Sequence, residues 1–339
     1  MKKLVNNPHD VVAEAVAGFV AAHREIVEGH GVDSQGPLYV TRAEGTAKPQ
    51  GKVGIVSGGG SGHEPLHIGF VGVGMLDAAV PGPVFTSPTP DPIGEATKAA
   101  DHGAGVLYVV KNYTGDVLNF ETAAELAEME DIEVKTVVVA DDVAVEDSTF
   151  TAGRRGVAGT VLVEKLAGAA AERGDSLEEV AAIAQRTADN VRTMGLALAP
   201  CTVPHAAKPS FDLADNEVEL GVGIHGEPGR RTIPMASADE LTDQLFDAVA
   251  RDLELNAKDR VIVLVNGLGG TPSSELYIVY RRVAERLASL GVDVARSMVG
   301  DFVTSIDMQG ASISILRVDD ELLELFDAPA HTAALRKGM

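Results

Sequence analysis

Short apolar runs alternate with longer helical patterns, and this alternation constrains the fold more than any other feature. Val106–Val110 is apolar throughout, while Val53–Val56 and Val134–Ala140 are rich in β-branched residues. Such runs are typical of strands buried on both faces of a parallel sheet. Helical spacing follows each run, for example over Val157–Glu172 and Leu177–Asn190. The sequence therefore predicts a doubly wound, mostly parallel α/β domain over residues 1–190.

Residues 191–339 predict a second α/β domain, built on a mixed sheet. Asn216–Ile224 alternates as a half-buried strand does, and Val261–Val265 is a continuous apolar run. An amphipathic helix is expected between them, over Glu240–Leu253. Further strands are expected near Val292–Val299 and Ser312–Val318.

Val53–Pro65 is the segment where we expect chemistry. It predicts a strand, then a glycine-dense turn, then His63 at the start of a helix over Leu66–Val73, with Pro65 in its first turn. Three interpretations compete. A tight structural connection is possible, whereas a nucleotide-phosphate loop fails because neither Lys-Ser/Thr nor GxGxxG spacing is present. A small-molecule site with His63 as acid, base or donor is slightly favoured over the first, because glycine lets a ligand approach closely.

The strand at Val106–Val110 leads into a second polar segment, Lys111–Asp116. Ligands of open parallel sheets bind beyond the carboxyl ends of the strands, so we expect Lys111 and Asp116 to lie beside His63. A helix N-cap is an equally good interpretation of Asp116, because aspartate suits that position.

A second isolated histidine, His225, lies in the glycine-rich segment Gly221–Gly229. Glycines on both sides would let a ligand reach the ring, which favours a functional role over a purely structural one. Gly153–Gly156 contains two arginines, for which a solvated turn is favoured over an anion or subunit contact. The single cysteine, Cys201, lies in an apolar run and is interpreted as a small buried hydrophobe.

The net charge of −22 argues against nucleic acid and anionic membranes as partners, because their phosphates would be repelled. So acidic a surface is typical of proteins from a high-salt cytoplasm. One cysteine excludes an intramolecular disulfide and a multi-cysteine metal site. Neither a signal-peptide pattern nor an apolar run of about 18 residues is present, so a cytoplasmic location is expected.

Five long motifs occur in one chain, namely Gly58–Pro65, Phe85–Asp91, Lys111–Asp116, Thr151–Gly156 and Gly223–Gly229. Together they resemble one known family, the K subunits of dihydroxyacetone kinases, and the resemblance covers essentially the whole chain. It implies that His225 attacks the ketone carbon of dihydroxyacetone and holds it as a hemiaminal, with His63 and Asp116 as the acid/base pair. It also implies that Gly60, Ser61, Gly62 and Lys111 bind the remaining substrate oxygens.

The resemblance further implies a division of labour between subunits. No segment resembles the helical L domain, so the chain is expected to be a separate subunit that binds no metal or nucleotide itself. ADP or ATP with Mg²⁺ would be carried by an L-type partner, recharged indirectly by an M-type protein of the phosphotransferase system. The family also suggests a homodimer. The alternative is a non-catalytic coactivator paralogue that binds dihydroxyacetone and signals to a transcription factor.

Overall fold

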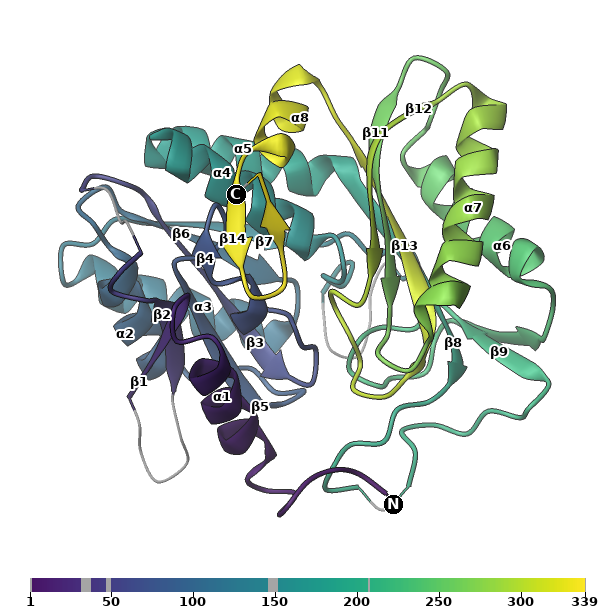
Figure 1. The fold of residues 1–339 in the computed structure, drawn as a ribbon, viewed down its shortest axis with the longest axis horizontal. Coiled ribbons are helices and arrows are strands. Elements are labelled where there is room, and N and C mark those ends of the chain that lie inside the picture. Colours follow the sequence, from purple (N-terminus) through teal and green to yellow (C-terminus); the bar gives the residue numbers. More distant parts are fainter. Residues whose placement is uncertain (1, 32–37, 47–49, 146–151, 207, 339) are drawn as a thin grey trace.

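The computed structural model describes residues 2–31, 38–46, 50–145, 152–206 and 208–338. Within these ranges the strands form two six-stranded sheets and one three-stranded sheet (Figure 1). The first sheet has the order β1 (Val27–His30), β2 (Tyr39–Arg42), β5 (Ala78–Val84), β3 (Gly54–Ser61), β6 (Val106–Lys111) and β7 (Val134–Val139). The second has the order β10 (Arg231–Pro234), β9 (Glu217–Leu220), β8 (Val191–Ala199), β13 (Gln309–Arg317), β11 (Arg260–Gly267) and β12 (Asp293–Gly300).

The first sheet is doubly wound, as predicted. Strands β5, β3, β6 and β7 are parallel, and β1 and β2 add an antiparallel edge. Side chains alternate between the two faces: Val56 and Tyr108 pack with α2 (Pro90–Ala100) and α3 (Thr114–Glu128). Ile55 and Leu107 instead join the core around α4 (Thr160–Arg173) and α5 (Leu177–Asn190).

The second sheet is mixed, which also confirms the prediction. Strands β11 and β12 are parallel, whereas β13, β8, β9 and β10 continue the sheet in antiparallel pairs. Helices α6 (Ala238–Asp252) and α7 (Ser273–Leu290) cover one face. On the other face, Ile262, Leu264 and Leu316 belong to the same core as α4 and α5. The two sheets therefore share one hydrophobic core.

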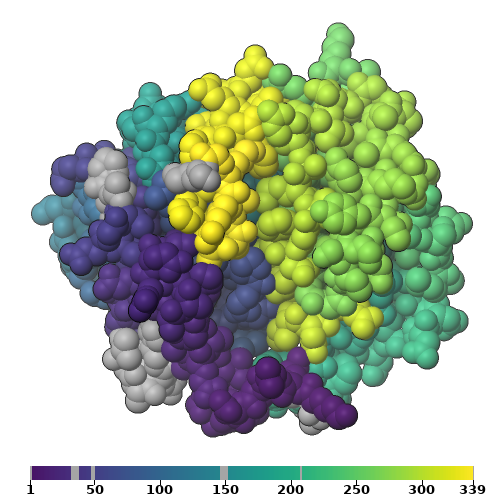
Figure 2. All heavy atoms as spheres, in the orientation of Figure 1, coloured from purple at the N-terminus to yellow at the C-terminus, as the bar shows by residue number. Residues whose placement is uncertain are grey.

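The chain end returns to the N-terminal half. After α8 (Asp320–Asp327), strand β14 (Ala330–Thr332) pairs with β15 (Arg336–Lys337) and with β4 (Gly72–Val73). Figure 2 shows this C-terminal segment, in yellow, seated between the N-terminal residues and the second sheet. The division at residue 190 stays a prediction, although β8 begins there. None of the helices within the described ranges combines the length and apolar character that a bilayer crossing needs.

Two local predictions around the glycine-rich segment are wrong. Gly58–Gly60 are not a turn but continue β3, because their missing side chains admit neighbouring backbone: a Cβ on Gly60 would lie 2.5 Å from the Thr86 nitrogen. The helix expected over Leu66–Val73 is replaced by a short 3₁₀ turn at Ile68–Phe70 followed by β4. Pairing with the distant β14 decides the conformation there, and no local pattern encodes it.

Other deviations are smaller. The strand expected over Asn216–Ile224 is confined to β9, since Gly221 adopts a φ of 77° that ends the ladder. Strands β1 and β2 flank residues 32–37, which lie outside the described ranges, as do residues 47–49. The first helix, α1 (Val11–Ala22), has Asp10 as its N-cap.

Asp77 holds a buried ion cluster in the N-terminal half. Its carboxylate accepts from Arg42 Nη1 at 3.0 Å, from Lys52 Nζ at 2.5 Å and from the Ile55 N–H at 2.9 Å. Burial alone would raise the pKa of Asp77, but Lys52 and Arg42 outweigh it and hold the pKa below its ordinary value. A lowered folded-state pKa stabilises the protein above the unfolded-state pKa of about 4, and this stability is lost as the pH falls further.

We therefore predict that Asp77→Ala lowers the free energy of unfolding by about 3–5 kcal/mol at pH 7, because the buried Lys52 loses its carboxylate partner and Arg42 loses one carboxylate while it keeps Glu172, at 2.6 Å. Urea unfolding measures this change. Asp293→Ala, at an exposed position of β12, is the control and should stay within about 0.5 kcal/mol of the wild type. A loss at Asp77 no larger than the control's would contradict a stabilising cluster.

Candidate active site

The residues singled out in the sequence come from two loops, the end of one strand and the start of one helix. His63 follows β3, Lys111 ends β6, and Asp116 lies in the first turn of α3. His225 lies in the loop after β9 of the second sheet. The His63 and His225 ring centroids are only 4.7 Å apart, in an edge-to-face arrangement. The structure thus joins two histidines that lie 162 positions apart in the numbering.

Two aromatic side chains frame this pair of histidines. Phe85 stacks on His63 with ring centroids 5.1 Å apart and contacts His225 at 5.6 Å. Tyr113 approaches His225 edge-on at 4.3 Å. Phe85 adopts a φ of 56°, a left-handed conformation that costs a bulky residue about 1–3 kcal/mol and persists only where the surroundings enforce it. The two histidines therefore have fixed, largely apolar walls.

His63 is fully buried, and its proton arrangement follows from one contact. Its Nδ1 lies 2.8 Å from the Thr304 carbonyl oxygen, which can only accept, so Nδ1 carries the hydrogen and donates it. Burial lowers the pKa of His63 to about 3, and the charge of the nearby Lys111 contributes to this shift. At neutral pH the ring is therefore uncharged, and Nε2 presents a lone pair.

His225 is also held neutral. Burial lowers its pKa well below the ordinary value, and the positive charges of Lys111 and Arg155 act in the same direction. The residue as a whole keeps part of its surface accessible, although its ring Nδ1 is buried. Its backbone N–H donates to Glu227 Oε2 at 2.9 Å.

Asp116 is a buried carboxylate at the start of α3. The N-cap interpretation of Asp116 is wrong, because Tyr113 occupies that position. Asp116 Oδ2 lies 3.9 Å from Lys111 Nζ. Burial raises the pKa of Asp116, while Lys111 and a hydrogen bond from Ser87 partly oppose the rise.

Four polar atoms at this place have no hydrogen-bond partner among the described residues. They are His63 Nε2, His225 Nδ1, Tyr113 Oη and Asp116 Oδ1, and all four are buried. Such atoms are rare in folded proteins, because each costs about 1–3 kcal/mol when it is left unsatisfied. A small ligand with several hydroxyl or carbonyl oxygens would satisfy them.

Beneath Asp116, a buried array fixes Lys111. Lys111 Nζ lies 2.8 Å from His67 Nε2, and His67 Nδ1 lies 2.6 Å from Glu164 Oε1. Ser57 Oγ donates to the Val109 carbonyl at 2.6 Å and accepts from His67 Nδ1 at 3.0 Å. His67 thus carries its hydrogen on Nδ1 and accepts from the lysine. Burial raises the pKa of Glu164 to about 8.

Gly60, Ser61 and Gly62 adjoin His63, but several of their polar groups already have partners. Ser61 Oγ donates to the Gly82 carbonyl at 2.7 Å, and the Gly62 N–H donates to the carboxylate of Glu64 at 3.0 and 3.1 Å. The role of these three residues in substrate binding stays a prediction.

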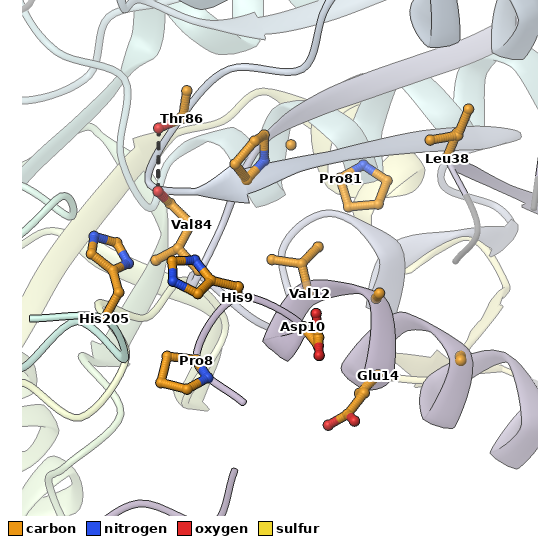
Figure 3. A pocket seen from close by; sticks show the side chains of 14 residues that line it. Pro8, His9, Asp10, Val12, Glu14, Leu38, Pro81, Val84, Thr86 and His205 are labelled. Carbon is orange, nitrogen blue, oxygen red and sulfur yellow. Dashed lines mark hydrogen bonds between the residues drawn. The ribbon is translucent and has the colours of Figure 1, made fainter. Parts of the chain in front are cut away.

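Two cavities lie beside α1. One, of about 760 Å³, separates the start of α1 from the end of β5 and is lined by Val12, Pro81, Thr86 and His205 among others (Figure 3). The second, of about 600 Å³, lies between the apolar face of α1 and the Ser61–Gly62 backbone. Across the described ranges, no three His, Cys, Asp or Glu side chains are grouped as a metal site would need.

Sequence reasoning missed several residues of this site. Phe85 and Tyr113 lie inside motifs that it quoted, but nothing local marks them as walls of the site. Glu164 carried a usable signal, because a charge inside the apolar pattern of α4 must be paired when buried. The solvated turn favoured for Gly153–Gly156 is wrong for Arg155, which is only 2% exposed. Cys201 is buried, as predicted.

Comparison with known proteins agrees with this geometry. The Dak1 domain family matches residues 17–334. The dihydroxyacetone-binding subunit DhaK of the PEP-dependent dihydroxyacetone kinase of Escherichia coli K12 is 51% identical, with 100% of both chains covered. The dihydroxyacetone kinase of C. freundii is similar in structure, with a TM-score of 0.90 and 34% identity over 99% of this chain and 60% of that one. The dihydroxyacetone kinase operon co-activator Dha-DhaQ gives a TM-score of 0.88 and 35% identity over 96% of this chain and 98% of its own. The chain therefore belongs to the Dak1 domain family.

Proposed function

We propose that this chain is the substrate-binding, catalytic subunit of a dihydroxyacetone kinase. It captures dihydroxyacetone on His225 and presents a substrate hydroxyl to a nucleotide-carrying L-type partner, which gives dihydroxyacetone phosphate. The observation that carries the proposal is the meeting of two neutral histidines, 4.7 Å apart, in a site where Asp116 supplies a buried, unpartnered carboxylate oxygen. A triose with one carbonyl and two hydroxyls matches that set of atoms.

The capture step needs a neutral imidazole. A lone pair on one ring nitrogen of His225 attacks the ketone carbon, and the nitrogen–carbon bond forms as the C=O π pair moves to oxygen. That oxygen gains a proton while the other ring nitrogen loses one, so the hemiaminal and the ring both end uncharged. The lowered pKa of His225 supports this step, because a protonated ring has no lone pair to use.

His63 is suited to hold the hemiaminal once it forms. Because Nδ1 donates to Thr304, the free Nε2 can only accept a hydrogen bond. The new hydroxyl of the hemiaminal is a donor of the right kind. Lys111, with Gly60, Ser61 and Gly62, would serve the remaining oxygens.

Asp116 is suited to be the general base of phosphoryl transfer. It would take the proton of a terminal substrate hydroxyl as that oxygen attacks the γ-phosphoryl group held by the partner. A raised pKa makes the carboxylate a stronger base, and Lys111 helps to keep it ionised. ADP or ATP and Mg²⁺ would reside on the partner, recharged by an M-type phosphotransferase protein, and this chain would act as a homodimer in a soluble complex.

A coactivator that binds dihydroxyacetone without turning it over is the second candidate. Its support is the co-activator structure, which is as similar to this chain as the kinase structure is. Asp116 favours the enzyme, because a sensor needs no base at the transferred hydroxyl. The decisive experiment mixes the chain with an L-type subunit, dihydroxyacetone and, in separate arms, ATP or the phosphoenolpyruvate system. Formation of dihydroxyacetone phosphate supports the kinase, whereas capture without product in either arm supports the coactivator.

Covalent capture should be insensitive to mild acid. An ordinary histidine loses its lone pair below a pH of about 6.5. The pKa of His225 lies well below that value, so adduct yield at pH 5.5 should match the yield at pH 7.5. Intact-mass measurement after rapid desalting at each pH checks this. A decline centred near pH 6.5 would mean that His225 is not held neutral.

A further inference from the structure

We infer that Arg155 and Glu227 form a positioning pair that fixes the orientation of His225, an inference that rests on the proposed capture of substrate by His225. Glu227 uses both carboxylate oxygens. Oε2 accepts from the His225 backbone N–H at 2.9 Å, and Oε1 accepts from Arg155 Nη1 at 3.1 Å. The position of the histidine backbone is thereby coupled to one guanidinium group.

That guanidinium group is anchored on the other half of the molecule. Arg155 donates to Asp142 Oδ2 from Nε at 2.8 Å and from Nη2 at 2.6 Å, and Asp142 follows β7 of the first sheet. Nη2 also donates to the Gly221 carbonyl at 2.8 Å, where the His225 loop begins. Arg155 therefore binds the loop at its start and, through Glu227, just past its histidine. Charge-assisted bonds of this kind are strong and directional when they are buried.

The loop is closed tightly around the pair. A Cβ on Gly223 would lie 1.7 Å from Glu227 Oε1 and 2.8 Å from Arg155 Nη1, so a side chain at this position would displace both groups. On the other side, Gly226 has a φ of 75° and lies against Cys201, where a Cβ would be 2.8 Å from Sγ. These contacts leave the His225 backbone little freedom. They give the glycines of this segment a packing role in addition to ligand access.

Orientation matters because the reaction is an attack along a defined line. A misplacement of about 1 Å costs such a reaction about 100-fold in rate. Glu227→Gln tests the pair most cleanly, because the two bonds are accepted by different oxygens and the amide replaces one of these oxygens by an NH₂ donor. We expect adduct formation with dihydroxyacetone to slow about 100-fold in this variant, while its thermal unfolding temperature stays close to the wild type's.

Arg155→Lys is the second variant. It keeps the charge beside Asp142 but loses the fork that reaches Glu227 and Gly221, so it should slow capture similarly. In the double variant the loss should be about that of either single change, because the two residues act as one unit. The matched control is Arg154→Gln: Arg154 adjoins Arg155 but pairs with Asp252 at 2.8 and 2.6 Å, and its loss should leave capture unchanged.

The readout is the rate constant of adduct formation, followed by rapid mixing and intact mass, beside circular dichroism and thermal unfolding. Capture at the wild-type rate in Glu227→Gln or in Arg155→Lys would overturn the positioning role. A lowered unfolding temperature with unchanged capture per folded molecule would mean that the pair only stabilises the fold. That result would also overturn the positioning role. If the wild type itself forms no adduct, the proposed capture fails, and this inference fails with it.

Discussion

Replacing His225 by alanine should abolish covalent capture of dihydroxyacetone and lower turnover with the L-type partner by about 10³-fold or more. The methyl side chain has no lone pair with which to attack the ketone carbon. His63 is fully buried, so we do not expect its Nε2 to take over the attack. Intact mass with dihydroxyacetone and a coupled assay for dihydroxyacetone phosphate measure the two effects.

His205→Ala is the matched control for this change. His205 is exposed and lines the cavity of Figure 3, whose lining includes neither His63 nor His225. Its removal should leave both the adduct and turnover at wild-type levels. An intact adduct in the His225→Ala variant would show that another group is the nucleophile.

Asp116→Asn should separate capture from transfer. The variant should still form the hemiaminal, because Asp116 takes no part in the attack by His225. Turnover should fall about 10²–10⁴-fold, the range over which a positioned general base acts. Asparagine keeps the size of the side chain but cannot take up the hydroxyl proton.

The two readouts for this variant are adduct yield by intact mass and the rate of dihydroxyacetone phosphate formation. Asp91→Asn is the control, since Asp91 occupies the first turn of α2 at an exposed position. Turnover of Asp116→Asn close to the wild type's would remove Asp116 from its role as base. Loss of the adduct as well would mean that Asp116 is needed to shape the site.

Much of the fold could be predicted because its strongest signals are local. In a chain of this size, a continuous apolar run such as Val106–Val110 is stable when it is buried as a strand of a parallel sheet. The helix at Leu177–Asn190 has both an amphipathic pattern and a Ser176–Glu179 capping box, and the structure has the same bounds. The helix was predicted correctly because its amphipathic pattern and its capping residues indicate the same bounds.

The segment after His63 could not be predicted because distant contacts decide it. Strand β4 exists through its pairing with β14, about 260 residues later in the chain. The glycines of β3 likewise looked like a turn, yet each is set by what lies against it: a Cβ on Gly59 would lie 2.3 Å from Lys111 Nζ. A single sequence does not show which partner a glycine accommodates.

Some residues of the candidate site could likewise be predicted from local sequence patterns, and others could not. The positions of the strand ends led us to expect Lys111 and Asp116 beside His63. The structure places Lys111 Nζ 3.9 Å from Asp116 Oδ2 and close enough to His63 to lower its pKa. The approach of His225 to His63 required the relative placement of two sheets, which no local pattern contains. Arg155 was misread for the same reason, because its partner Glu227 belongs to the opposite half of the molecule.

The most direct test of covalent capture by His225 is the intact mass of the wild-type chain with and without dihydroxyacetone, after rapid desalting. We predict a gain equal to one dihydroxyacetone per chain, with no water lost, because a hemiaminal is a simple addition product. The same sample treated with glycerol, which has no carbonyl to attack, should show no gain. An unchanged mass with dihydroxyacetone, in a preparation that still phosphorylates it when the L-type partner is added, would contradict covalent capture by His225.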